Sequence, residues 1–305
     1  MLHAVNYALL LLPDFSLILV GYLVCRHTAL DRTVWQPVEA LVYYLLFPVL
    51  LFRSIVQSPL DGAAASTLMA AGLLLSLGGI ALAYALPWLP GLGRRLDRRD
   101  HAAAAQVGFR FNSFIGLALA ERLAGSAGLQ AIAVLIGVCV PLLNVAAVWP
   151  MARHGSRSFA RELLRNPLIV ATVSALACNL LGLRIPEWAA APLQRIGAAS
   201  LALGLMAAGA GMQLGLLRSS KLLTLGVLAI RHALLPLWAW VLVFLLPLQP
   251  TQALVLMAFS ALPTASSCYV LAARMGYNGA YVAGLVTLST VLGLASLPLA
   301  LGLLR

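Results

Sequence analysis

The chain has 305 residues, of which 62% are hydrophobic and only 10% are charged. An ordinary soluble domain is about half apolar and about a quarter charged, so this composition excludes a water-soluble globular protein and predicts one integral membrane domain. The formal net charge of +11 would suit nucleic acid, but the basic residues lie in short clusters between apolar runs, where they set membrane topology, and we expect no nucleic-acid partner.

Apolar segments long enough for a spanning helix, which needs about 20 residues, recur along the whole chain. Charged residues and Gly- or Pro-rich stretches separate them. They predict helices near residues 5–25, 35–56, 63–89, 102–121, 127–151, 167–183, 188–216, 222–246, 251–274 and 279–304. The pattern indicates an all-α membrane protein with ten transmembrane helices.

Lys and Arg are distributed unequally over the connections between these helices. Thirteen lie in the odd-numbered connections, and five lie in the even-numbered ones or at the C-terminus. Because basic residues concentrate in cytoplasmic loops, we expect the odd connections to be cytoplasmic and both termini to be periplasmic.

An odd number of helices in each half means that a duplicated five-helix unit inserts in opposite orientations, as in many carriers. We expect a first repeat at residues 1–151, a cytoplasmic linker at 152–165 and a second repeat at 166–305. A proline near the start of both the second and the seventh helix, Pro37 and Pro192, is a faint trace of this duplication.

Two polar clusters lie inside apolar helices, near the expected middle of the bilayer. The fourth helix contains RFNS from Arg110, and the ninth contains PTASS from Pro263. Polar groups at that depth are costly and usually serve function. The two clusters also hold the same ordinal place in their halves, so the sequence predicts one shared site.

Both helices are expected to break at these clusters. Pro263 lacks an N–H and interrupts a helix, while Asn112 and Ser113 are good N-cap residues. Each half-helix that begins after a break has a partly positive N-terminus, and two such ends facing one cavity favour an anion. The residues expected at this anion site are Arg110, Asn112, Ser113, Pro263, Thr264, Ser266, Ser267 and Arg231.

Plainer interpretations of these residues stay open at this stage. Pro263 could cause a simple kink, with the nearby hydroxyls bonded to the preceding turn. Asn112 could bridge two helices as a packing contact, and Arg110 could extend towards the cytoplasmic headgroups.

Arg231 in the eighth helix also lies near mid-depth, where an unpaired guanidinium is expensive. It therefore needs a water-filled cavity or an acidic partner. Asp14 is the leading candidate for that partner or for a proton-carrying site, unless it caps the first helix near the periplasmic surface. Solvated charge is expected for the carboxylates at helix ends and in connections, which are Glu39, Glu121, Glu162 and Glu187.

Enzymatic motifs are absent: the sequence has no HExxH, no GxSxG elbow, no Walker A and no dinucleotide fingerprint. We therefore expect no enzymatic activity and no cofactor, so that uphill transport would need a proton or sodium gradient. The cysteines have no ligand spacing, predict no metal site and are expected to be small buried hydrophobes. They are Cys25, Cys139, Cys178 and Cys268.

In order and spacing, six segments resemble the auxin efflux carrier family, which includes plant auxin exporters and bacterial carriers of dicarboxylates such as malate and malonate. They are LPDFSLILVGYLVCR, LVYYLLFPVLLFRSI, RFNSFIGLAL, NPLIVATVSAL, AIRHALLPL and LPTASSCYVLAARMG. The resemblance implies two inverted five-helix repeats, a scaffold part, a transporter part, and broken fourth and ninth helices that cross at the substrate site. Asn112 and Pro263 match the family's asparagine and proline. Ala118 stands where members often carry proline, and many members have an asparagine near the position of Ser267.

These observations together predict a secondary carrier of a small organic anion, a carboxylate or dicarboxylate, that works by alternating access. The alternative is a membrane ligand sensor or receptor with a carrier-like fold. The excess of Arg and Ala over a single lysine, Lys221, points to a bacterial inner membrane. The expected partners are the anion and the lipid bilayer, and a homodimer stays open.

Overall fold

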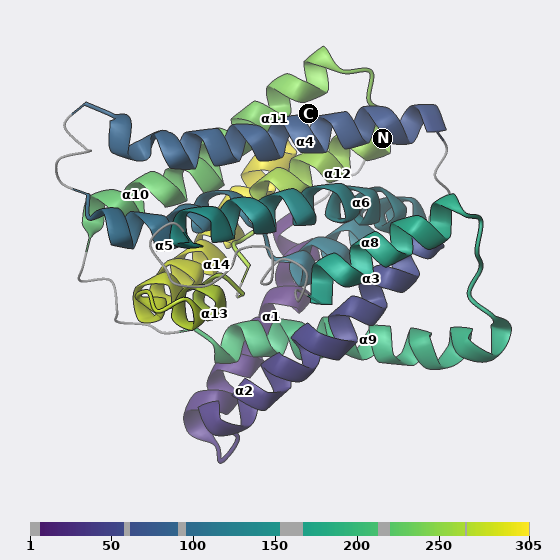
Figure 1. The fold of residues 1–305 in the computed structure, drawn as a ribbon, viewed down its shortest axis with the longest axis horizontal. Coiled ribbons are helices and arrows are strands. Elements are labelled where there is room, and N and C mark those ends of the chain that lie inside the picture. Colours follow the sequence, from purple (N-terminus) through teal and green to yellow (C-terminus); the bar gives the residue numbers. More distant parts are fainter. Residues whose placement is uncertain are drawn as a thin grey trace.

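The computed structural model describes residues 7–57, 62–90, 96–152, 167–212, 220–265 and 267–304. Within these ranges all regular secondary structure is helical, and no strand is present. The elements, shown in Figure 1, are α1 (Tyr7–His27), α2 (Arg32–Leu41), η1 (Val42–Leu46), α3 (Phe47–Val56), α4 (Gly62–Ala85), η2 (Leu86–Trp88), α5 (Arg98–Phe109), α6 (Ser113–Ala152), α8 (Pro167–Leu180), α9 (Glu187–Ala210), α10 (Lys221–Ala229), η3 (Ile230–Leu234), α11 (Leu235–Leu245), α12 (Pro250–Ala261), α13 (Ser267–Arg274) and α14 (Gly279–Gly302).

The all-helical fold class is confirmed, and each predicted segment is helical over most of its length. Among the described residues, five helices are long and apolar enough to cross a membrane, and two further apolar helices are shorter. The five are Arg32–Arg53, Ser66–Trp88, Ala127–Met151, Lys221–Leu245 and Gly279–Gly302. The count of ten spans and the inverted repeat stay predictions.

Two long helices contain a π-helical turn just before a proline. The turn η1 is followed by Pro48 and the turn η3 by Pro236, each at the start of the next helical segment. Proline has no N–H and its ring crowds the carbonyl one turn earlier, so the preceding turn widens. In η3 the N–H of Leu235 accordingly bonds to the carbonyl of Ile230, five residues back.

The helix α6 is bent where the sequence predicts a connection between its fourth and fifth helices. Ala124 and Gly125 leave the helical conformation, and Gly125 has a φ of 56°. Glycine adopts this left-handed backbone without the clash of a Cβ atom. The part of α6 before Gly125 therefore belongs to the predicted fourth helix, and the part after it to the fifth.

Helices α1 and α9 pack so closely that their backbones touch at glycines. A Cβ atom at Gly209 would lie 1.8 Å from the carbonyl oxygen of Ile18, and one at Gly21 would lie 1.9 Å from that of Met206. Small residues allow such close approach between helices in a membrane. This contact joins the first helix to one encoded far later in the chain.

The helices divide into two groups by their contacts. The scaffold group consists of α1, α2, η1, α3, α8 and α9, in which α1 packs on α9 and α3 packs on α8 and α9. The crossover group consists of α4, η2, α5, α6, α10, η3, α11, α12, α13 and α14. In Figure 1 α2 and α9 lie in the lower part of the view and α4, α11 and α12 in the upper part, with α5 and α6 between them.

The two short helices α5 and α12 lie in the centre of the crossover group. All residues from His101 to Phe109 are buried, as are all residues from Val255 to Ala261. A helix that is buried on every side is surrounded by protein. Irregular backbone at the ends of these helices is therefore shielded from lipid, which membrane proteins require.

We predict that Gly209→Ala separates α1 from α9, because its new methyl group would collide with backbone that cannot swing aside. Overpacking of this kind typically costs about 1–3 kcal/mol, so the midpoint of thermal unfolding in detergent should fall. Gly302→Ala is the matched control, since a Cβ atom there meets no atom within 4 Å. Equal midpoints for the two variants would contradict the backbone contact.

Candidate functional site

The fourth predicted helix is broken without a proline. Helix α5 ends at Phe109, Arg110 is extended with φ −79° and ψ 145°, and α6 begins at Ser113. Asn112 caps α6, since its Oδ1 accepts from the N–H of Ile115 at 3.3 Å. The predicted interruption near Asn112 is therefore present. It lies upstream of Ala118, so the missing family proline does not prevent it.

The ninth predicted helix is broken at its proline. Helix α12 ends at Ala261, Leu262 to Ala265 are not helical, and α13 begins at Ser267. The Thr264 N–H donates to Ser289 Oγ of α14 at 2.9 Å. A Cβ atom at Gly293 of α14 would lie 2.6 Å from Pro263 Cγ, so glycine is what lets α14 pack against the break. Ser266 lies outside the described residues.

The two breaks are bonded directly to each other. The N–H of Asn112 donates to the carbonyl of Pro263 at 2.7 Å, and Thr264 Oγ1 donates to the carbonyl of Val107 at 2.8 Å. Asn112, Ser113, Pro263 and Thr264 are all buried. The clusters predicted from the sequence thus come together at one place.

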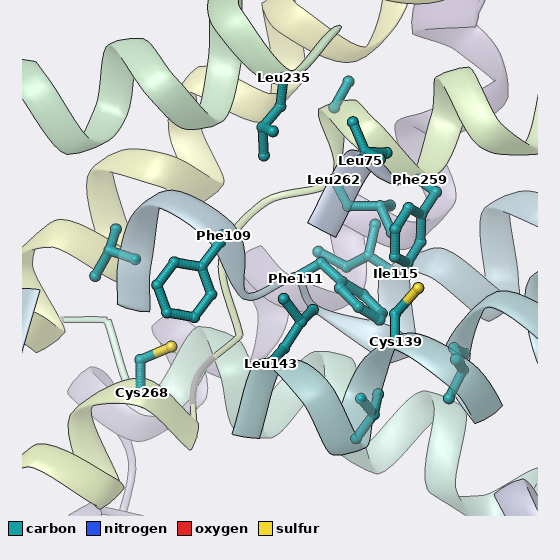
Figure 2. Close-up of a cluster of buried hydrophobic side chains, with 14 of the residues drawn as sticks. Leu75, Phe109, Phe111, Ile115, Cys139, Leu143, Leu235, Phe259, Leu262 and Cys268 are labelled. Atoms are coloured by element: carbon teal, nitrogen blue, oxygen red, sulfur yellow. The ribbon is translucent and has the colours of Figure 1, made fainter. Parts of the chain in front are cut away.

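Apolar side chains enclose this crossing. The rings of Phe111 and Phe259 meet at 4.3 Å between centroids, and Figure 2 shows Phe111 beside Ile115 and Leu262 where the two irregular segments pass each other. Phe109 lies on the other side of the same turn. Water is therefore kept from the main-chain hydrogen bonds between the breaks.

Arg231 binds the carbonyl ends of both interrupted helices. Its Nε donates to Leu262 O at 2.6 Å and its Nη2 to Phe259 O at 3.0 Å, while Nη1 lies 3.4 Å from Phe109 O. The side chain is only 2% exposed. Among the described residues no carboxylate pairs with it. Asp14 lies in α1, but its side chain is outside the described part, so the predicted pair stays a prediction.

Arg110 is the C-cap residue of α5, and its side chain crosses to the start of α13. Its Nη2 donates to Ser267 Oγ, at the first residue of α13, at 2.9 Å, and its Nη1 donates to Gln106 Oε1 at 2.8 Å. It is 7% exposed, so the alternative of a side chain extended into headgroups does not hold. No carboxylate whose side chain is described forms an ion pair with it.

Several polar residues of the site are missed by the sequence patterns. Gln106 also donates to the carbonyl of Cys268 at 3.1 Å. Because residues four apart on a helix are neighbours, its spacing from Arg110 could have predicted that it belongs to the site. His232, in η3, has its Nε2 2.9 Å from Ser289 Oγ, which donates to Thr264 Oγ1. A chain of hydrogen bonds therefore supports the ninth-helix break from α14 and η3.

One polar cluster joins the scaffold group to the crossover group, and it corrects an expectation. Glu39 of α2 was expected to be solvated. Instead its side chain is 17% exposed, it pairs with Arg32 at 2.6 Å, and it accepts a hydrogen bond from Tyr269 of α13. The Tyr269 hydroxyl also accepts from Arg32 at 3.2 Å. Glu121 and Glu187 are exposed, as expected.

The four cysteines are free thiols in the structure. Cys139 and Cys268 are buried, as the sequence predicts, whereas Cys25 and Cys178 are half-buried. Cys268 follows Ser267 at the start of α13, beside the polar cluster, and is fully inaccessible to solvent. Its thiol therefore reports on any opening of this region.

A comparison with protein families finds that the model described as a membrane transport protein matches residues 140–301, more than half of the chain. The match runs from the C-terminal half of α6 into α14 and includes Arg231 and Pro263. A search of curated proteins finds no match.

We predict that Asn112→Ala lowers stability by about 0.5–2 kcal/mol, the usual cost of removing an N-cap side chain. Asn112→Ser should stay close to the wild type, because a serine hydroxyl caps a helix as well and the main-chain bond to Pro263 is kept in both variants. Thermal unfolding in detergent compares the three proteins. An alanine variant as stable as the serine variant would show that the cap contributes nothing.

Proposed function

The chain belongs to the auxin efflux carrier family of membrane transport proteins, and from this premise we propose that it carries a small organic anion across the bacterial inner membrane. It is a multi-pass membrane protein of a transporter family. The proposed cargo is a carboxylate or dicarboxylate, and the proposed site is the crossing of the two interrupted helices.

The charges around the crossing support an anionic cargo. A helix end carries about half a unit charge, positive at the N-terminus and negative at the C-terminus. Arg231 faces the C-terminal ends of α5 and α12, which together offset its charge. Arg110 bonds to the start of α13 and lies three residues before the start of α6, so positive charges add there.

The observation that carries the proposal is the charge of Arg110, which no carboxylate among the described side chains offsets. A buried guanidinium beside partly positive helix ends is costly unless an anion joins it. Adding one guanidinium to two half-charges gives about two positive charges, which matches a dicarboxylate better than a monocarboxylate. Asn112, Ser113, Thr264, Ser266 and Ser267 stay proposed as its polar surroundings.

The packing of the helices supports the proposed inverted repeat. If the second five helices repeat the first, α1 corresponds to α8 and the α2–α3 helix corresponds to α9. The contact of α1 with α9 and the contact of α8 with α3 are then equivalent. The breaks before α6 and before α13 are equivalent in the same way.

Alternating access requires the crossover group to move against the scaffold group. The cluster of Arg32, Glu39 and Tyr269 bonds the two groups together, close to the start of α13. By the distribution of basic residues this end is cytoplasmic. We propose that the cluster closes the cytoplasmic side of the site and separates when that side opens.

Binding of the proposed cargo can be measured on the purified protein. Dicarboxylates should raise the unfolding temperature of the purified protein, and Arg110→Gln should weaken that binding roughly tenfold to a hundredfold, because a hydrogen bond to a charged group contributes about 1.5–3 kcal/mol. Arg99→Gln is the matched control, since Arg99 is exposed and bonds to Gly276 O.

Counterflow of labelled anion in liposomes then separates a carrier from a receptor. A carrier exchanges the label across the membrane, whereas a receptor binds it without exchange. Unchanged affinity in Arg110→Gln would overturn the assignment of the site.

Opening of the cytoplasmic side can be followed by the reactivity of Cys268. Glu39→Gln removes the ion pair and Tyr269→Phe removes the hydroxyl, so both should raise the reaction rate of Cys268 with a maleimide, with the other three cysteines replaced by alanine. An ion pair of this kind contributes about 1 kcal/mol or less, so we expect up to roughly fivefold faster labelling.

Tyr277→Phe is the control for this experiment. It also removes a tyrosine hydroxyl, but that group donates to Met151 O within the crossover group. If Tyr277→Phe accelerates labelling as much as Tyr269→Phe does, the cluster is no barrier between the two groups.

A further inference from the structure

The contacts of Arg231 differ in kind from those of a ligand-binding residue. Its donors reach main-chain oxygens of Phe259 and Leu262 at the end of α12 and of Phe109 at the end of α5. These carbonyls belong to the last turns of the helices or to the residue just beyond, where few intrahelical donors remain. The Phe259 carbonyl also accepts from the N–H of Leu262 at 3.4 Å. In a membrane protein unpaired carbonyls cost several kcal/mol each. One planar side chain thus satisfies groups from both interrupted helices.

The position of Arg231 is fixed by its own helix. It lies in the widened turn η3, which precedes Pro236, and π-helical turns of this kind are frequent at functional sites. Next to it, His232 is held between Ser289 and Ser296 of α14 at 2.9 and 2.7 Å. The turn η3 is therefore attached to α5 and α12 through Arg231 and to α14 through His232.

We infer that Arg231 is a positioning residue that fastens the C-terminal ends of α5 and α12 into one unit. The two helix starts that follow, α6 and α13, then keep a fixed separation while the crossover group moves. In this arrangement Arg110 binds the anion, and Arg231 fixes the positions of the helix ends around the anion. This inference rests on the proposed function only for its transport consequence, because the clamp itself exists without any ligand.

Lysine is the informative replacement for Arg231. It keeps the positive charge that offsets two helix ends, but its single ammonium cannot reproduce the three separate donors of a guanidinium plane. Arg231→Lys is therefore expected to fold while losing the bridge between the two breaks. Arg231→Gln, which also removes the charge, should show the same effect more strongly.

Hydrogen–deuterium exchange on the purified protein without ligand tests the clamp. In Arg231→Lys, peptides covering residues 107–116 and 259–270 should both exchange faster, by on the order of tenfold. Peptides from the α1–α9 contact should be unchanged. Arg53→Lys is the matched control in the scaffold group, where the buried Arg53 Nε has no hydrogen-bond partner among the described residues.

A second measurement links the clamp to transport. If the wild type binds dicarboxylates, malonate, succinate and glutarate should compete less selectively for Arg231→Lys, because a loosened crossing tolerates different distances between carboxylates. Faster exchange at only one break, or equally across the whole chain, would overturn the clamp. Absence of any anion binding by the wild type would overturn the proposed function instead, since the exchange result does not depend on a ligand.

Discussion

Main-chain hydrogen bonding inside the membrane is the constraint on which this structure depends. An interrupted helix leaves N–H and C=O groups without their usual partners, and lipid offers none. Here the interruptions are placed against each other, so that the Asn112 N–H meets the Pro263 carbonyl and the Thr264 hydroxyl meets the Val107 carbonyl. Groups at each break provide hydrogen-bond partners for main-chain groups at the other. This is why both breaks occur at one place in the centre of the crossover group.

The two buried arginines of the crossing differ in role because they bond to opposite kinds of helix end. Arg231 faces carbonyl ends and is offset by the protein itself. Arg110 reaches a helix start, and there the protein supplies further positive potential. The same side chain therefore serves as a structural tie in one position and as an attraction for an anion in the other. The local direction of the backbone, and not residue type, distinguishes them.

Sequence reasoning locates the breaks well because their causes are chemical and local. Pro263 cannot donate a hydrogen bond, and Asn112 is polar where its surroundings are apolar. The partners of Arg231 could not be predicted, because they are main-chain carbonyls and every residue has one. Glu39 was misjudged for a related reason, since its partner Tyr269 is 230 residues away. The π-helical turns before Pro48 and Pro236 follow from proline chemistry but give no periodicity that a helix pattern reveals.

The glycine contact between α1 and α9 has a consequence for how the protein is made. Gly21 and Met206 touch through their backbones, yet α9 is synthesised long after α1 has entered the bilayer. Until α9 is inserted, the face of α1 that packs on α9 is therefore exposed to lipid. The face of α3 that packs on α8 is exposed in the same way until α8 is inserted. Completion of the scaffold group is postponed until the second half of the chain has been inserted. Assembly of the early helices thus depends on α8 and α9, which are encoded in the second half of the chain. A chain truncated before them would leave α1 and α3 without their main packing partners.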